Sequence, residues 1–282
     1  MSILYLVATP IGNLGDLSPR AREILGTVDF IAAEDTRVTQ KLLTACELPR
    51  KPMISYYEHN RRARGEVVLE RMLGGETCAL VTDAGTPAVS DPGEDLVALC
   101  AEHDIPVIPV PGCCAAVCAL AASGLPTGRW CFEGFLSVNK KARREHLDAL
   151  EGEKRTMIFY EAPHKLCATL RDLAAAFGED RRLSLSRELT KLHEQTLRMT
   201  IGEAVRYFDE NAPRGEFVLI VEGAPDEPET EASEEERLAA AAEAVRRRME
   251  QGQTQKDAVK AVSAEVGVKK NALYRYVLEN EE

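Results

Sequence analysis

The sequence has no long hydrophobic run and few aromatic residues. Aromatic side chains make up 5% of the 282 residues, and only one of them is tryptophan. No uninterrupted apolar stretch approaches the roughly 18 to 20 residues that cross a bilayer. The opening MSILYLVATPIGN also has no basic segment ahead of its short apolar stretch. We therefore expect no membrane segment, no secretion signal and a cytoplasmic protein.

Cysteine and histidine are present without the spacings of metal sites. None of the eight cysteines belongs to a C-x-x-C pair, and no two of the five histidines have H-x-x-x-H spacing. Such spacings are typical of zinc sites. We therefore expect no metal and no disulfide framework, and we expect buried thiols in a reducing compartment. The chain also lacks the G-x-G-x-x-G pattern of nicotinamide-binding Rossmann domains.

Basic residues are too few to balance the acidic ones, since the formal net charge is −11. This balance argues against broad nonspecific affinity for nucleic acid. Part of the acidic excess lies in residues 226–236 (DEPETEASEEE), which contain no base and cannot bury enough apolar area to order themselves. Cations gather locally in residues 61–64, 140–144 and 246–248. Each group could contact RNA phosphates or simply form a solvated helix face.

Apolar runs and helical periods divide the chain into four parts. Short runs alternate with helical segments up to about residue 112, which predicts a mostly parallel sheet. More closely spaced strands then indicate a second α/β domain with antiparallel pairs, and three short helices with a glycine turn follow residue 236. We predict an N-terminal α/β domain in residues 1–117, a second α/β domain in 118–225, an acidic linker in 226–236 and a helix-turn-helix-like tail in 237–282. A packing or dimerisation appendage is the alternative for the tail.

The segment TDAGTPAVSDPG is unusually dense in turn residues. Between Asp83 and Gly93 it holds two aspartates, two prolines and two glycines, directly after an apolar run. Asp83 would place an acceptor at the sheet edge where open α/β sheets bind ligands. Ser90 and Asp91 could instead cap a helix that begins at Pro92. After the fourth run, VPGCC opens another helix, whose first amides can hold an anionic or polar group.

Charged residues also follow the second apolar run, in AEDTR. Glu34, Asp35 and Arg37 stand together there, and one or two of the acids could bind a substrate hydroxyl. Capping of the next helix by Asp35 is the simpler alternative. The segments YYEHN and EAPHK each present a histidine in a polar loop, where it could equally be an ordinary surface residue.

These segments together carry a resemblance to a known family. In order along residues 1–225, ATPIGNLGD, AEDTR, YYEHN, TDAGTPAVSDPG, PGCCA, EAPHK and SRELTK resemble the tetrapyrrole methylase superfamily. AEDTR, DAGTP-x-x-SDPG and EAPHK together resemble the branch that methylates bacterial small-subunit ribosomal RNA. The resemblance implies two α/β domains of the tetrapyrrole methylase type, with a helical C-terminal extension.

The resemblance also implies an activity and its participants. These are 2′-O-methylation of a cytidine ribose in the P-site decoding region of 16S rRNA within the 30S ribosomal subunit, S-adenosyl-L-methionine as cofactor, and a homodimer. The cofactor would lie between the two domains. The residues implied to bind it are Pro10, Asp83, Thr86, Cys114, Ala115, Tyr160, Glu161 and Leu189. The family pattern P-G-P-S-A reads PGCCA here, so a serine hydroxyl is replaced by the Cys114 thiol.

Methyl transfer to a ribose hydroxyl needs alignment and a group that accepts the hydroxyl proton. Glu34, Asp35 and His59 are the candidate acceptors, with Arg37 as an orienting or phosphate-contacting group and Asn60 beside His59. Two other functions stay open on the sequence. One is a small-molecule methyltransferase of the same superfamily that acts on a porphyrinoid, and the other is a noncatalytic RNA-binding module.

Overall fold

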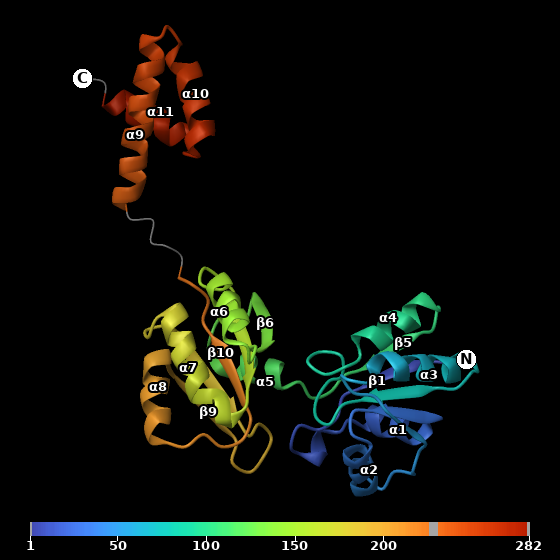
Figure 1. The fold of residues 1–282 in the computed structure, drawn as a ribbon. Coiled ribbons are helices and arrows are strands. Elements are labelled where there is room, and N and C mark those ends of the chain that lie inside the picture. Colours follow the sequence, from blue (N-terminus) through green and yellow to red (C-terminus); the bar gives the residue numbers. More distant parts are fainter. Residues whose placement is uncertain (1, 226–230, 281–282) are drawn as a thin grey trace. The chain divides into compact units, whose positions relative to one another are not determined.

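The computed structural model describes residues 2–225 and 231–280, with residues 231–236 described by their backbone alone. Residues 1–224 and residues 225–282 form two separate compact units (Figure 1). The first unit contains two five-stranded sheets, and the described residues of the second unit form helices without strands. Within the described residues, no helix combines the length and the apolar character needed to cross a membrane.

The first sheet is parallel, as predicted, with strand order β3-β2-β4-β1-β5. Helices α1 and α2 pack on one face and α3 and α4 on the other (Figure 1). Because helices cover both faces, the central strands are continuous apolar runs. The strands are β1 (Leu4–Val7), β2 (Phe30–Ala33), β3 (Met53–Ser55), β4 (Cys78–Val81) and β5 (Val107–Val110). The helices are α1 (Pro19–Thr27), α2 (Thr36–Ala45), α3 (Arg61–Leu73) and α4 (Glu94–Glu102).

The second sheet is mixed, which confirms the expected antiparallel pairs. Its order is β6-β7-β10-β8-β9, and only β6 and β7 pair in parallel. Helices α6, α7 and α8 cover one face, and α5 covers the other. The strands are β6 (Trp130–Phe135), β7 (Thr156–Glu161), β8 (Arg182–Arg187), β9 (Gln195–Thr200) and β10 (Phe217–Val221). The helices are α5 (Ala115–Ser123), α6 (Lys140–Ala149), α7 (Pro163–Phe177) and α8 (Ile201–Glu210).

Helix α5 corrects the predicted boundary between residues 117 and 118. Ala116, Ala119 and Leu120 of α5 pack with Ile158 and Ile220 of the second sheet in one buried cluster. A boundary at residue 117 would divide this helix. The chain therefore passes from one sheet to the other before α5 begins, and the two sheets share one compact unit.

The C-terminal unit has its own core beneath three helices. Buried residues include Val245 of α9, Val259 of α10 and Leu273 of α11. Thr254 caps α10, and Gly267, with φ of 71°, ends it at the glycine turn that the sequence predicts. The helices are α9 (Glu231–Glu250), α10 (Gln255–Val266) and α11 (Lys270–Glu279).

Helix α9 begins inside the segment predicted to be a linker. Its first residue is Glu231, whereas the prediction placed residues 226–236 outside any helix. Glutamate and alanine have high helix propensity, and acidic side chains favour the N-terminal end of a helix dipole, so an acidic segment can still be helical. Residues 226–230 lie outside the described part of the chain.

Candidate active site

A cavity of about 370 Å³ lies between the carboxyl ends of β1, β2 and β4 and the second sheet. This volume falls in the range of sites for small organic ligands, roughly 300 to 1,000 Å³. From the first sheet and its loops it is lined by Ile11, Glu34, Thr82, Asp83, Ala84, Gly85, Thr86, Val89, Ser90 and Asp91. From the second sheet and α5 it is lined by Cys114, Ala115, Phe135, Tyr160, Glu161, Ala162, Ser186, Glu188, Leu189, Lys191, Glu216, Phe217 and Val218.

The loop after β4 is held in place by neighbouring loops. Gly85 adopts φ of +91°, a conformation that favours glycine, and exchanges two backbone hydrogen bonds with Thr9 at 2.9 and 3.0 Å. The Thr86 hydroxyl donates to the Cys113 carbonyl at 2.8 Å. Because these bonds join three loops, the cavity floor is built before any ligand enters.

Two carboxyl groups contact the Thr82 hydroxyl at the cavity floor. Thr82 Oγ1 lies 2.6 Å from Glu34 Oε2 and 2.7 Å from Asp91 Oδ2. A hydroxyl has one proton to donate, so both short contacts are hydrogen bonds only if one carboxyl group also carries a proton. Burial, together with the Glu34 carboxylate, raises the pKa of Asp91. Asp91 therefore gives up its proton less readily than an ordinary aspartate does.

Asp83 completes the acidic floor. Its Oδ1 accepts a hydrogen bond from the Asp35 amide at 3.1 Å, and its own amide faces Glu34 Oε2 at 3.3 Å. Burial raises the pKa of Asp83, and the carboxylates of Glu34, Asp35 and Asp91 raise it further. Negative charge concentrated in this way favours a ligand that carries a positive charge beside the loop.

Tyr160 and Glu161 form part of the opposite wall. The Tyr160 hydroxyl accepts a hydrogen bond from the Ala116 amide at 3.1 Å, and burial raises the pKa of this phenol to about 12. The buried Glu161 carboxylate accepts from the Ala162 amide at 2.8 Å and from the Thr169 hydroxyl. Tyr160 is therefore neutral at physiological pH, and Glu161 has a clear structural role.

The loop between β8 and β9 closes the cavity against the first sheet. Glu188 and Thr190 adopt φ of 51° and 67°, which is uncommon for a residue with a side chain and rare for a β-branched one. A Cβ added at Gly12 would lie 2.5 Å from Lys191 Cγ, so only glycine allows this approach. Lys191 brings a cation to the cavity, paired with Glu188 Oε1 at 3.0 Å.

The cavity gathers most of the residues that the sequence singled out. Those that line it are Glu34, Asp83, Thr86, Cys114, Ala115, Tyr160, Glu161 and Leu189. Pro10, Asp35, Arg37, His59 and Asn60 do not. For Pro10, the following residue, Ile11, lines the cavity in its place.

Asp35 and Arg37 are occupied with each other at the start of α2. Asp35 Oδ1 accepts from the Arg37 amide at 2.8 Å, and Asp35 Oδ2 lies 2.7 Å from the Arg37 guanidinium. Hydrogen bonds from Arg37 lower the pKa of Asp35 to about 2. The capping alternative is thus confirmed for Asp35, and a carboxylate this weakly basic is a poor proton acceptor.

The loop after β3 accounts for the position of His59 and Asn60. Strand β3 is the edge strand of its sheet, and no residue of the loop that follows it lines the cavity. The Asn60 side chain accepts from the Tyr57 amide at 2.9 Å and donates to the Ser55 carbonyl at 3.1 Å. Asn60 therefore shapes the loop, and the exposed His59 stands beside Tyr57 at 6.4 Å between ring centroids.

Several lining residues were missed by the sequence reasoning. Asp91 was assigned to a possible helix cap, but α4 begins at Glu94 after Gly93, without a side-chain cap. Glu188 and Lys191 belong to the segment SRELTK, whose charged residues were a usable signal. Phe135 ends a predicted strand, and only the pairing of that strand shows which way its ring points.

Comparison with known proteins agrees with this architecture. Residues 3–205 match the family described as "Tetrapyrrole (Corrin/Porphyrin) Methylases". A crystal structure of uroporphyrin-III-C-methyltransferase from Thermus thermophilus superimposes with a TM-score of 0.56 at 20% identity, and the match covers 77% of this chain and 93% of that one. The fold is therefore that of the tetrapyrrole methylases.

Curated relatives extend over the whole chain. Proteins named "Ribosomal RNA small subunit methyltransferase I" are 50% identical in Synechocystis sp., covering 100% of this chain and 99% of the relative, and 46% identical in Escherichia coli O157:H7, covering 99% and 95%. The protein of that name in Bacillus subtilis is 43% identical, covering 97% and 93%. The chain belongs to the tetrapyrrole methylase family, in the branch of ribosomal RNA small subunit methyltransferase I.

Proposed function

We propose that this protein transfers a methyl group from S-adenosyl-L-methionine to the ribose 2′-hydroxyl of a cytidine in the P-site decoding region of 16S rRNA, with the 30S subunit as substrate. Family membership supports methyl transfer from this cofactor to ribosomal RNA. The acidic cavity between the two sheets is the observation that carries the assignment of the site. The nucleotide and the atom come from the motif resemblance.

The cavity residues fit the cofactor. When bound, it supplies an electrophilic methyl group on a positively charged sulfur, and a solved structure with this fold is complexed with S-adenosyl homocysteine. Asp83 and Glu34 complement positive charge at the floor, while Ile11, Val89 and Leu189 exclude water around an adenosine-sized group. Ala84, Gly85 and Ala115 leave room for close approach of the ligand to the backbone.

The chain contributes mainly by positioning. Methyl transfer is an in-line displacement, so the ribose oxygen has to be aligned with the methyl group in a site closed to water. Of the three candidate proton acceptors, only Glu34 lines the cavity, and the pKa of Asp35 is too low for the role. We assign the acceptance of the 2′-hydroxyl proton to Glu34.

An incubation with labelled cofactor separates the candidate functions. The protein is mixed with labelled S-adenosylmethionine and, in parallel, unmodified 30S subunits, free 16S rRNA or a precorrin-type porphyrinoid. We expect label in 16S rRNA. Label in the porphyrinoid alone would establish the small-molecule activity, and absence of cofactor binding by calorimetry would leave the noncatalytic RNA-binding module.

We also propose a homodimer. A ribosomal substrate is much larger than the cavity, and a second copy related by twofold symmetry would extend the surface available to RNA. Light scattering at micromolar concentration should give twice the mass of the 31.0 kDa chain. A monomeric mass would contradict this part of the proposal.

A further inference from the structure

Phe135 is an exposed aromatic side chain beside the cavity. Its ring lines the cavity and is nevertheless 60% exposed, and Val138, three residues on, is 79% exposed. Large apolar side chains are costly to leave in water when a core is available. The neighbouring Phe132 is packed against the cluster that contains α5, so the core of this sheet face is filled without Phe135.

A β-bulge turns the Phe135 ring to the cavity side. In the pairing of β6 with β7, Phe132 lies opposite Ile158, Gly134 opposite Phe159 and Phe135 opposite Tyr160, so one extra residue is inserted in β6. Gly134 has φ of +63°, a conformation that glycine adopts readily. The insertion shifts the alternation of side chains by one residue.

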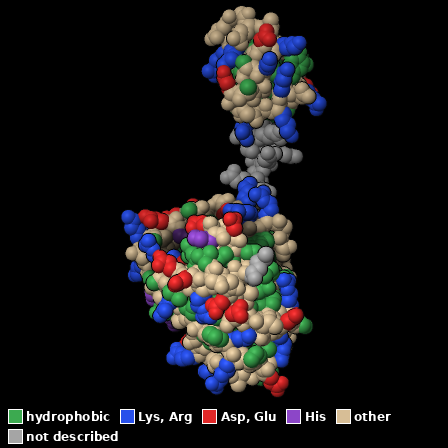
Figure 2. Space-filling view, turned by 90° about the vertical axis from the view of Figure 1, so that its right-hand side faces the viewer, with side chains coloured by type: hydrophobic (Ala, Val, Ile, Leu, Met, Phe, Trp, Pro, Cys, Tyr) green, Lys and Arg blue, Asp and Glu red, His purple; other side chains and the backbone are tan. Residues whose placement is uncertain are grey.

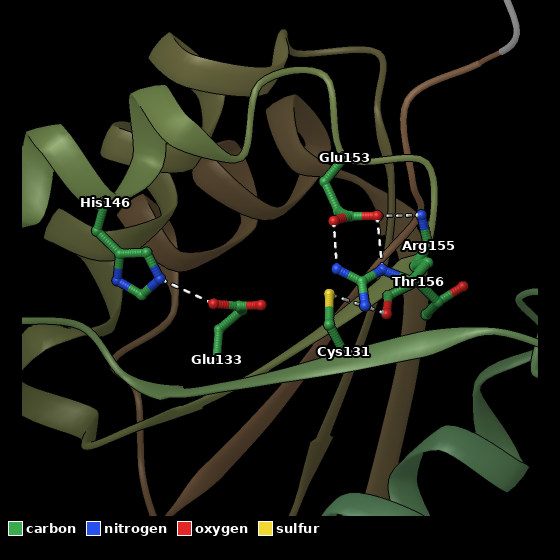
Figure 3. A network of polar contacts seen from close by, with 6 residues as sticks. All are labelled: Cys131, Glu133, His146, Glu153, Arg155 and Thr156. Atoms are coloured by element: carbon green, nitrogen blue, oxygen red, sulfur yellow. Dashed lines mark hydrogen bonds and ion pairs between the residues drawn. The ribbon is translucent and has the colours of Figure 1, made fainter.

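The ring contacts confirm the shifted alternation. Phe132 and Phe135 both pack edge-to-face on Tyr160, with centroid distances of 5.1 and 5.5 Å. Glu133, between them, points to the opposite face, where its carboxylate meets His146 Nε2 of α6 at 2.8 Å (Figure 3). Two phenyl rings and one phenol therefore stand on the cavity side of β6 and β7.

A polar network on the other face of the sheet holds β6 in place. Cys131 donates through its thiol to the Thr156 carbonyl at 3.8 Å, close to the Glu153–Arg155 ion pair (Figure 3). Burial and the nearby Glu133 carboxylate raise the pKa of Cys131 to about 12, so the thiol stays protonated and is a weak nucleophile. With His146 on Glu133, this network fixes α6 against β6.

Exposed cations follow Phe135 at the start of α6. Asn139 caps α6 by accepting from the amides of Lys141 and Ala142 at 3.0 and 3.2 Å. Lys140, Lys141 and Arg144 are exposed. The contacts of Lys141 and Arg144 with acidic residues four positions on are long, at 3.7 Å, and such surface pairs contribute little to stability. The cations are therefore available to a polyanion.

We propose that Phe135 stacks on a nucleobase of single-stranded RNA at the cavity, while Lys140, Lys141 and Arg144 contact the adjoining phosphates. This proposal rests on the proposed function and names the surface that delivers the RNA. A ribose hydroxyl can enter a cavity of this size only if its nucleotide leaves the stacked helix, and an aromatic ring stabilises the unstacked base. The positive charge after Phe135 complements the RNA backbone.

Three full-length variants test whether Phe135 stacks on a nucleobase. Phe135→Ala removes the ring, Phe135→Trp restores a stacking ring, and Trp130→Ala removes the other exposed aromatic side chain of β6, which is 41% exposed and does not line the cavity. The readouts are KM for 30S subunits, kcat, and the affinity for a decoding-region oligonucleotide containing 2-aminopurine, whose fluorescence falls on stacking. Phe135→Ala should raise KM and weaken RNA binding about ten- to a hundredfold, with a much smaller change in kcat.

The control variants distinguish a loss of base stacking from a loss of methylation activity and from misfolding. Phe135→Trp should recover wild-type RNA binding and quenching, and Trp130→Ala should behave as wild type. Replacing Lys140, Lys141 and Arg144 with alanine should weaken RNA binding and flatten its salt dependence. If wild type methylates 30S subunits but Phe135→Ala keeps wild-type KM and quenching, the stacking role is wrong. If Phe135→Ala instead converts a dimer to a monomer, the surface is an interface between copies and the proposal is overturned.

Discussion

The residues that the fold places around Asp83 and Asp91 determine the pKa values of these two carboxyl groups. In the sequence they are eight residues apart in one loop, and each could be a simple cap or surface group. In the structure both lie beside Glu34, and burial raises the pKa of each. The motif was predictable, but the contacts of the Thr82 hydroxyl with Glu34 and Asp91 were not, because they depend on β2 and β4 lying side by side.

Asp83→Asn should weaken the binding of S-adenosylmethionine by roughly ten- to a hundredfold, the usual effect of losing hydrogen bonds to a charged group. A cationic ligand favours the ionised carboxylate. Wild-type affinity should therefore fall as the pH is lowered through the raised pKa of Asp83, sooner than an ordinary aspartate would allow. Calorimetric titration across pH measures both effects. Equal affinity in wild type and Asp83→Asn, with Asp104→Asn as the exposed control, would make the loop purely structural.

Asp91→Asn should stabilise the protein at neutral pH. The folded-state pKa of Asp91 lies above the ordinary value of 3.8, so ionisation of this group costs folding free energy, and the cost grows as the pH rises from 3.8 through the folded-state pKa. Asparagine keeps a partner for Thr82 without that cost. We expect a gain on the order of 1 kcal/mol at pH 7, shrinking toward pH 4. Thermal unfolding at the two pH values measures it, and a loss of stability at pH 7 would contradict the raised pKa of Asp91.

At the scale of elements, local sequence signals predicted most helices and strands. The Thr254 cap and the Gly267 turn of α10 were evident because capping chemistry is local. Strand β3 was not predicted, since three half-buried residues at a sheet edge carry too little pattern. The membership of α5 was also misjudged, because the partner of an apolar helix is decided by long-range packing.

Helix α5 begins without a side-chain hydrogen bond at its N-cap residue. Cys114 is its N-cap residue and makes no side-chain hydrogen bond there. Cys114→Ser should supply an oxygen that accepts from the Val117 amide and should stabilise the protein by about 1 kcal/mol, a rise in Tm of roughly 2 to 4 °C. Cys118→Ser, at an exposed position inside the same helix, is the matched control and should show no such gain. Equal Tm values for both variants and wild type would refute the capping argument.

At the scale of the whole molecule, we propose that the C-terminal helical unit docks the ribosomal substrate and takes no part in binding the cofactor. The cavity lies within residues 1–224, and residues 225–282 form a unit with their own core. Lys and Arg side chains are spread over the face of that unit shown in Figure 2. Arg248 pairs with Glu265 at 2.7 Å, while Lys269, Lys270 and Arg275 are exposed. Exposed Tyr274 offers a ring for stacking, and Tyr276 packs on the core.

A chain that ends at Ala224 should bind S-adenosylmethionine with near wild-type affinity and methylate 30S subunits at least tenfold more slowly at low substrate concentration, because several phosphate contacts would be lost. Full-length protein with Lys269, Lys270 and Arg275 replaced by alanine should show part of the same loss. Calorimetry and initial rates measure the two properties. Full activity of the shortened chain, or loss of its cofactor affinity, would show that the helical unit does not dock the substrate.

In the proposed reaction, this cavity directs a methyl group to a cytidine 2′-hydroxyl of 16S rRNA. The most direct test is to incubate the protein with isotopically labelled S-adenosylmethionine and unmodified 30S subunits, digest the 16S rRNA to nucleosides and short fragments, and identify the labelled product by mass spectrometry. We expect label in 2′-O-methylcytidine from the P-site segment of the decoding region, and none with heat-inactivated protein. Label on a base, on a different nucleoside or in another segment would contradict it.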